Sequence, residues 1–283
     1  MPLGKNNNRY HLIADVFQMN KHDLTIFKSF EDICRKTPSA PFLISPSRNQ
    51  KDMTTFSYQE TFEKANKISS IFLENGYGNN MRVATLLGST PAHYIVKLAL
   101  NKIGVSVVPI NPDYSPDETA YLLADSGSLL AICAEHYMEQ LKTAIAYKNL
   151  SVPIVVYNEI ETIQPLKPSS NLEEQVHGKT EASLLYTSGT TGRPKGCILS
   201  HEYELMCGDV YANIGAPISL SFGKDKILNP LPSYHINAGI VTFFAAMLTG
   251  NSLIQPERFS ISSWWKDINE TEATIFHYLG VII

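Results

Sequence analysis

The sequence contains few cysteines, the residues that form disulfide bonds and most structural zinc sites. Only four cysteines occur in 283 residues, at Cys34, Cys133, Cys197 and Cys207, and none belongs to a CxxC pair or a Cys/His cluster with zinc spacing. This excludes a disulfide framework and a zinc site of the usual pattern, and we predict no metal ligands. The cysteines are expected to be reduced core thiols, which fits a cytoplasmic setting.

The chain also has a small net charge and no long apolar run. Lys and Arg number 23 against 27 Asp and Glu, so the formal net charge is −4 and the pI is near 6.1. Such a chain has no overall basic field to attract nucleic acid or an anionic membrane. No apolar run reaches the roughly 18 residues that span a bilayer, and the N-terminus lacks the apolar run of a signal peptide. We therefore expect no nucleic acid partner and no integral membrane segment, and we assign no targeting signal.

The chain does contain a regular alternation of helix and strand signals. Ser57 followed by Glu60 predicts a capping box at the start of a helix that runs to Asn75 and ends at Gly76. Apolar runs that predict strands occur at 82–88, 105–110, 128–133 and 153–157. Segments of helical period lie between them, at 91–103, 116–125 and 137–145. Because the strands are apolar on both faces, the pattern predicts a mostly parallel sheet covered by helices on both sides.

A polar stretch separates this region from the rest of the chain. We predict an N-terminal arm at 1–26, a first α/β subdomain at 27–160, a surface connection at 161–180, and a second α/β subdomain that begins with a phosphate loop at 181–283. Within the last part, strands are expected at 226–231 and 252–255 and a buried helix at 238–249. Ile261, Trp264, Trp265 and Ile268 are expected to form one face of a further helix, with the two tryptophans in the core and at partly covered surface.

The string YTSGTTGRPKG, residues 186–196, has the composition of a polyphosphate site. Its glycines allow positive φ angles and close backbone approach, its hydroxyl side chains add donors, and Lys195 supplies a compensating charge. It is not a Walker A loop, because Pro194 precedes Lys195 and Gly196 comes directly after it. A solvent-exposed turn between two strands is the alternative for a bare Gly/Thr cluster, and the complete ordered string favours phosphate binding.

This string resembles, residue for residue, the phosphate loop of the AMP-forming acyl-CoA synthetases, the adenylating superfamily that includes luciferases and the adenylation domains of peptide synthetases. The segments NKIGVSVVPINPDYSPDETAYLLADSG (101–127), LSHE (199–202) and NPLPSYHINAG (229–239) also resemble family segments, in family order. Together they cover most of the chain from about residue 27. PSYHINAG and ATIFHYLGV are most similar to the crotonobetaine/carnitine-CoA ligase type.

The resemblance implies a helix-flanked α/β fold with mostly parallel sheets, that of the N-terminal domain of an acyl-CoA synthetase. It also implies an ATP-dependent ligase, as in fatty acid metabolism. A carboxylate attacks the α-phosphate of ATP to give an acyl-adenylate and pyrophosphate, and the thiol of coenzyme A then displaces AMP. The implied ligands are a carboxylic acid, ATP, Mg²⁺ and coenzyme A. The identity of the acid stays open, as does the choice between coenzyme A and a carrier protein as thiol acceptor.

Site residues are implied by the resemblance, position by position. The residues implied around the β- and γ-phosphates are Thr187, Ser188, Gly189, Thr190, Thr191, Gly192 and Lys195. Lys195 and His235 are the implied catalytic residues, and the implied substrate pocket contains Tyr234, His235, Asn237 and Gly239. Arg193 stands at the family's variable position and is expected to be solvated. His201 is left open between local hydrogen bonding and function, and the remaining histidines, His277 among them, are expected to be structural.

The sequence departs from the family beyond the matched segments. It has no Tyr-Gly-x-Thr-Glu segment for adenine and magnesium, no Thr-Gly-Asp segment for the ribose, no hinge and no lysine of a C-terminal domain. We therefore expect an N-terminal portion of such an enzyme, incomplete at the C-terminus and inactive by itself. Two alternatives stay open: a non-catalytic nucleotide- or acyl-binding remnant, and a P-loop NTPase, which the unmatched Walker A pattern disfavours.

Overall fold

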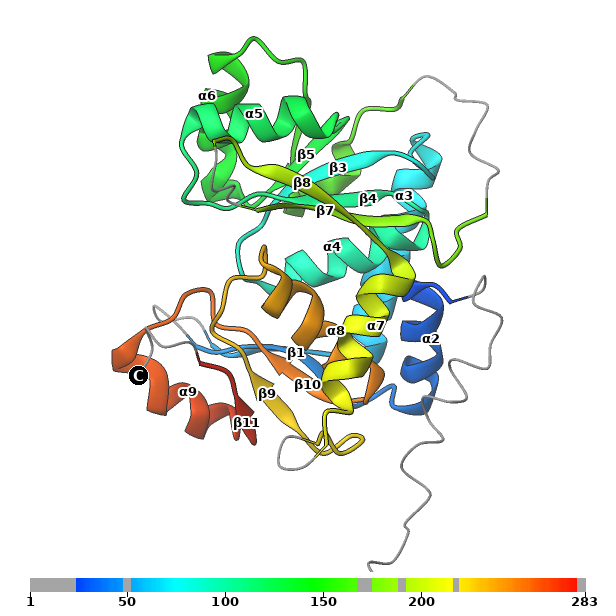
Figure 1. The fold of residues 1–283 in the computed structure, drawn as a ribbon, viewed down its shortest axis with the longest axis vertical. Helices are drawn as coiled ribbons and strands as arrows, with labels where there is room; N and C mark the ends of the chain where they lie inside the picture. Colours follow the sequence, from blue (N-terminus) through cyan, green and yellow to red (C-terminus); the bar gives the residue numbers. More distant parts are fainter. Residues whose placement is uncertain (1–23, 48–51, 167–174, 188–191, 216–218, 279–283) are drawn as a thin grey trace, which may run out of the picture.

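In the residues that the structure describes, two β-sheets lie one above the other, with helices between them and on both outer faces (Figure 1). The computed structural model describes residues 24–47, 52–166, 175–187, 192–215 and 219–278. The layers therefore alternate helix, sheet, helix, sheet, helix. The expected α/β fold with helix-flanked, mostly parallel sheets is confirmed.

The upper sheet of Figure 1 has six strands in the described part of the chain. In sheet order they are β6 (Ile154–Val156), β5 (Leu130–Cys133), β3 (Arg82–Leu86), β4 (Ser106–Pro109), β7 (Glu181–Thr187) and β8 (Lys195–Ser200). All neighbouring pairs are parallel except β7 and β8, which are antiparallel. The strands predicted at 82–88, 105–110, 128–133 and 153–157 are thus confirmed.

The lower sheet has five strands among the described residues. In sheet order they are β11 (Ile275–Phe276), β9 (Lys226–Leu228), β10 (Ser252–Ile254), β1 (Pro41–Ser45) and β2 (Thr54–Ser57). Each sheet therefore takes strands from both sides of the predicted connection at 161–180. Chain position alone does not say which sheet a strand joins.

Helices of the central layer fill the space between the sheets. They are α2 (Ile26–Lys36), α3 (Tyr58–Glu74), α4 (Pro91–Lys102), α7 (His201–Ala212) and α8 (Phe243–Leu248). The largest apolar core combines their side chains with one face of each sheet, for example Val107 of β4 and Leu253 of β10. The outer helices are α5 (Pro116–Ser126) and α6 (Met138–Tyr147) on the upper sheet and α9 (Trp264–Thr271) on the lower.

Short helical turns complete the described structure. They are the 3₁₀ turns η3 (Glu135–Tyr137), η4 (Tyr157–Thr162) and η6 (Ile261–Ser263), and the π-helix η5 (Asn237–Thr242), which leads into α8. The buried helix predicted at 238–249 is therefore present, with a π-helical first part. π-Helical turns are rare and are frequently found at functional sites.

Local sequence signals explain where the helices begin. The capping box predicted from Ser57 and Glu60 is present in full at the start of α3. Helix α5 starts with a second one, in which the Ser115 side chain accepts from the Glu118 amide and the Glu118 carboxylate accepts from the Ser115 amide. Such reciprocal bonds satisfy amides that a helix leaves without an internal partner.

Four residues are less buried than expected: Cys197, Cys207, Ile261 and Trp265. Cys197 is exposed on β8, and Cys207 on α7 is half-buried, so only Cys34 and Cys133 are core thiols; all four are unpaired. Ile261 and Trp265 are 83% and 69% exposed, so the prediction of one covered helix face is wrong for them. Trp264 and Ile268 do pack on the outer face of the lower sheet. Helical spacing placed all four together, but α9 begins only at Trp264.

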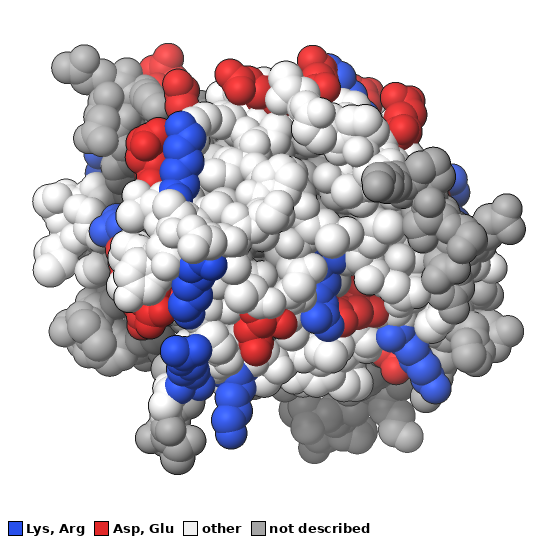
Figure 2. Space-filling view, turned by 90° about the horizontal axis from the view of Figure 1, so that it is seen from above, with Lys and Arg blue, Asp and Glu red and all other residues white. Residues whose placement is uncertain are grey.

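On the face shown in Figure 2, acidic and basic side chains are interspersed around a largely uncharged centre.

None of the described helices combines the length and the hydropathy required to cross a membrane.

Candidate functional site

The glycine-rich string lies in a hairpin at the edge of the upper sheet. Thr187 at the end of β7 is opposite Lys195 at the start of β8 in the antiparallel pair. Ser188, Gly189, Thr190 and Thr191, predicted to contact phosphate, lie outside the described residues. The expected position of the string between two strands is confirmed.

The described residues of the string have properties suited to an anion. Gly192 has a φ of 140°, in the region that favours glycine over other residues. Thr187, Gly192 and Lys195 are exposed. No carboxylate among the described residues forms an ion pair with the Lys195 ammonium, which is therefore accessible to a ligand anion from solvent.

The segment Asn229–Gly239 reaches the same sheet edge from the lower sheet. Strand β7 is parallel to β4, and β4 to β3, so the carboxyl ends of all three strands lie at one edge. Ser233 ties the segment to that edge, because its amide donates to Ser89 Oγ at 3.0 Å and its hydroxyl donates to the Gly88 carbonyl at 3.0 Å. The segment is thus held at the edge where the carboxyl ends of these parallel strands lie, the usual place for ligands in such folds.

A cleft of about 240 Å³ opens where the two sheets meet. Its walls are the turns after β3, β4, β9 and β10, together with the ring of Tyr137. They comprise Gly88, Ser89, Pro112, Asp113, Tyr137, Pro230, Leu231, Pro232, Tyr234, Glu257, Arg258 and Phe259. A larger hollow of about 510 Å³ on α6 and β6 is a shallow surface feature and contains none of the predicted site residues. The smaller cleft is the better candidate for a ligand because polar and aromatic groups converge there from both sheets.

Tyr234 and His235 lie at the turn between this cleft and η5. Tyr234 lines the cleft, and its ring centroid is 4.7 Å from that of His235, which is exposed. Partial desolvation lowers the pKa of His235, so its imidazole is neutral at physiological pH and has a free acceptor nitrogen. Gly239 is buried, and a Cβ there would stand 2.0 Å from the Ser233 carbonyl oxygen. Glycine is therefore needed to close this turn.

Behind this turn is a polar cluster that the sequence did not predict. Asn237 Oδ1 accepts from Asn229 Nδ2 at 2.9 Å and lies 3.2 Å from His277 Nδ1. His277 also contacts the Tyr211 hydroxyl through Nε2, and burial lowers its pKa to about 4. The imidazole is thus neutral and bonded on both nitrogens. The cluster links β9, η5, α7 and β11, and no local pattern could reveal it, because these elements are distant in sequence.

Groups for a protein-held metal are not found in the described part of the chain. No three His, Cys, Asp or Glu side chains there are arranged to hold an ion. The described residues thus do not fit a magnesium site built from protein carboxylates, whereas the exposed Lys195 and the left-handed Gly192 fit a polyphosphate.

The sequence of the chain matches a known protein family. The family model described as "AMP-binding enzyme" matches residues 30–283. The chain belongs to the AMP-binding enzyme family. This confirms the resemblance inferred from the glycine-rich string.

Relatives within this family include coenzyme A ligases. The chain is 28% identical over 250 residues to a sulfoacetate–CoA ligase of Cupriavidus necator, covering 87% of this chain and 48% of that protein. It is 26% identical over 240 residues to a crotonobetaine/carnitine–CoA ligase of Citrobacter koseri, covering 81% of this chain and 46% of that protein. The chain thus spans about half the length of these curated relatives.

Solved structures of AMP-binding enzymes share the fold. A fatty acyl-CoA synthetase of Mycobacterium tuberculosis superposes with a TM-score of 0.77 at 21% identity, covering 91% of this chain and 50% of that one. An o-succinylbenzoate coenzyme A synthetase of Bacillus subtilis, solved in complex with ATP and magnesium ion, gives a TM-score of 0.71 at 22% identity, covering 88% of this chain and 62% of that one. At these identities the likeness concerns the fold.

Proposed function

We propose that this chain supplies the polyphosphate-binding part of an ATP-dependent acid–thiol ligase. In this reaction a carboxylic acid is activated to an acyl-adenylate and is then transferred to coenzyme A. The observation that carries the proposal is the β7–β8 hairpin, in which the exposed Lys195 lies opposite Thr187 at the carboxyl end of β7. The family match and the coenzyme A ligases among the relatives support it.

We assign the pyrophosphate side of ATP to the string. Thr187, Gly192 and Lys195, with the residues 188–191 between them, surround the β- and γ-phosphates in this proposal. The chemistry requires a carboxylate held in line with the α-phosphate and stabilisation of charge on the departing pyrophosphate, and both are matters of positioning and electrostatics. Lys195 provides the cation for that charge. Because the described carboxylates form no metal site, Mg²⁺ is proposed to arrive on the nucleotide.

We assign the acid to the region around Tyr234, His235, Asn237 and Gly239. Tyr234 lines the cleft, and the neutral His235 imidazole is free to contact the reacting carboxylate. Asn237 belongs to the polar cluster behind the turn and would fix the position of the turn.

We place the reaction in the cytoplasm, where the four unpaired cysteines would stay reduced.

Equilibrium binding of MgATP to this chain, measured by titration calorimetry, tests the assignment to ATP. We expect inorganic pyrophosphate to compete with MgATP. Because this chain by itself is expected to be inactive, incubation of a longer protein that contains it with MgATP and a panel of carboxylic acids then separates the classes of activity. Pyrophosphate release that depends on the acid supports the ligase, and phosphate release indicates an NTPase. A chain that binds neither MgATP nor pyrophosphate would overturn the assignment of the string.

A further inference from the structure

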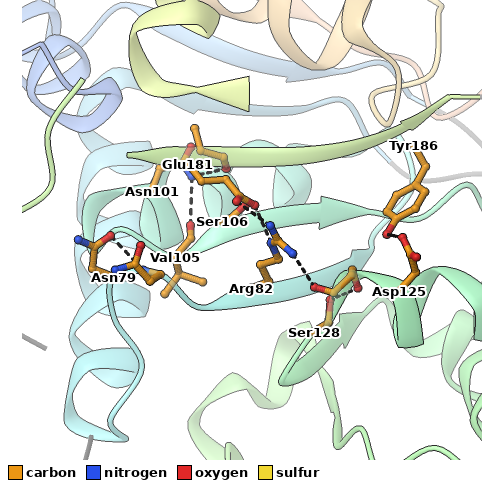
Figure 3. Close-up of polar contacts among 12 residues, drawn as sticks. Asn79, Arg82, Asn101, Val105, Ser106, Asp125, Ser128, Glu181 and Tyr186 are labelled. Carbon is orange, nitrogen blue, oxygen red and sulfur yellow. Dashed lines mark hydrogen bonds and ion pairs between the residues drawn. The ribbon is translucent and has the colours of Figure 1, made fainter. Parts of the chain in front are cut away.

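Helix α5 holds the end of strand β7. The hydroxyl of Tyr186, the residue before the last of β7, donates to Asp125 Oδ2 at 2.6 Å (Figure 3). Tyr186 is buried, and burial together with this bond raises the pKa of its phenol well above the ordinary value. The phenol therefore stays protonated and keeps donating to the carboxylate at any physiological pH.

The same helix holds the chain just before β8. Tyr121 lies one helical turn before Asp125, so both side chains project from one face of α5. Its hydroxyl donates to the carbonyl of Pro194 at 3.2 Å, and the Arg193 guanidinium lies 5.0 Å from its ring centroid. The rings of Tyr121 and Tyr186 meet edge to face at 6.4 Å. One helix face thus contacts both described ends of the glycine-rich string.

The C-terminal end of α5 is itself fixed to the start of β7. Arg82 donates from Nε and Nη2 to the two carboxylate oxygens of Glu181, at 2.7 and 2.8 Å, and from Nη1 to the Ser126 carbonyl at 3.0 Å (Figure 3). Ser106 adds a third bond to Glu181. Because Ser126 ends α5 and Glu181 begins β7, this network sets the position of the helix along the strand.

We propose that Tyr121 and Asp125 are positioning residues for Lys195. They act through Pro194 and Tyr186, which they hold in place, and they fix the two strand ends before any ligand binds. This inference rests on the proposed function, since it assumes that Lys195 binds the polyphosphate of ATP. When the backbone next to a binding lysine is already held in place, less conformational entropy is lost as the ligand arrives, so the anchors increase affinity without touching ATP.

Three variants test the proposal. Tyr121→Phe removes the bond to Pro194 and keeps the ring, and Asp125→Ala removes the acceptor for Tyr186. Asp125→Asn keeps an acceptor and is the conservative rescue. Tyr58→Phe is the matched control, because the Tyr58 hydroxyl donates to backbone carbonyls in the buried core, including that of Asn251 at 2.9 Å. This control separates loss of stability from loss of positioning.

The first readout is MgATP affinity by titration calorimetry. We expect Tyr121→Phe and Asp125→Ala each to weaken binding about three- to tenfold, the usual effect of losing one hydrogen bond. Asp125→Asn should bind within about twofold of the unaltered chain, and Tyr58→Phe should lower the melting temperature with unchanged affinity. Equal affinity in Tyr121→Phe, Asp125→Ala and the unaltered chain would overturn the positioning role.

The second readout needs no ligand. Amide hydrogen exchange in Tyr121→Phe should accelerate at Lys195 and Gly196 and stay unchanged at Ile198, farther along β8. Unchanged exchange at Lys195 and Gly196 would overturn the anchoring. If the unaltered chain bound no MgATP, the proposed function would fail, and this exchange experiment would still decide whether α5 holds the strand ends.

Discussion

Lys97 and Glu204 form an ion pair between the two sheets that is almost closed to solvent. Lys97 Nζ lies 2.8 Å from Glu204 Oε2, and the two side chains are 2% and 0% exposed. Lys97 also donates to Ser183 of β7. The pair therefore joins two central helices, α4 and α7, to the strand that leads into the glycine-rich string.

Removal of either charge from this pair should destabilise the fold strongly. Lys97→Met or Glu204→Leu leaves an unpaired buried charge, which typically costs about 3–5 kcal/mol. The double variant should lose much less than the sum, because no charge is then buried. Urea unfolding of the three variants measures this, and single variants within about 0.5 kcal/mol of the unaltered chain would contradict the description of the pair.

Lys195→Ala should weaken MgATP binding at least about tenfold, because a charge-assisted bond contributes roughly 1.5–3 kcal/mol. Its melting temperature should stay unchanged, since an exposed lysine contributes little to stability. Lys266→Ala is the matched control, because Lys266 is an exposed lysine on α9 that pairs only loosely with Glu270, at 3.7 Å. Titration calorimetry distinguishes the two variants. Equal affinity in both would remove Lys195 from the site.

His235→Ala should leave MgATP binding within about twofold of the unaltered chain, because the proposed polyphosphate site is on the β7–β8 hairpin. The variant should instead change which carboxylic acids support pyrophosphate release, or the rate of release, as expected for a group beside the acid. The measurement is pyrophosphate release across an acid panel at saturating MgATP, in a longer protein that contains this chain and the family segments for adenine, magnesium and ribose, because this chain by itself is expected to be inactive. Parallel loss of ATP binding and of acid activation would indicate a structural role for His235.

Stability should fall as the pH drops below neutrality. Burial, with a contribution from Lys97, lowers the pKa of both His93 and His201 to about 3 from an ordinary value of 6.5. The unfolded chain therefore binds protons at these imidazoles from pH 6.5 downward, and the folded chain does not until about pH 3. Stability is complete above pH 6.5 and is lost progressively as the pH falls toward 3. Melting temperatures of the unaltered chain and His201→Asn between pH 7 and 4 should show a shallower slope for the variant.

Gly208→Ala should destabilise the packing of α7 on α8. A Cβ at Gly208 would stand 2.4 Å from Phe244 Cβ, so the helices would have to move apart. Overpacking of this kind costs about 1–3 kcal/mol, more than the roughly 1 kcal/mol that alanine gains in helix propensity. The control is Ser70→Ala at an exposed position of α3. Thermal unfolding should show a lower melting temperature for Gly208→Ala only.

Much of the fold could be predicted from local pattern. Ser57 and Glu60 marked the start of α3, and the alternation of apolar runs with helical periods identified the parallel strands of the upper sheet. Phosphate binding by the string stays a prediction, based on the Gly, Thr and Lys residues at these positions. Its position between two strands was indicated by the apolar runs on either side.

Contacts of the candidate site could not be predicted in this way. The hydrogen bond between Tyr121 and Pro194 joins residues 73 positions apart, and the one between Tyr186 and Asp125 joins residues 61 positions apart. No sequence pattern near His277 indicated its contact with Asn237. Trp265 has the spacing of a core residue but is exposed.

The sequence by itself determined the helical and strand periods, the helix caps and the glycine-rich string, because each depends on residues within a few positions of one another. Only the tertiary structure decided that β1 and β2 join β9–β11 and that β7 pairs with β4. The same is true of the hydrogen bond from Ser233 to Ser89, which holds the two sheets together at one edge. These arrangements depend on which apolar faces bury each other across the whole chain. This packing lowers the free energy of the complete fold, and the residue pattern of a short segment does not reveal it.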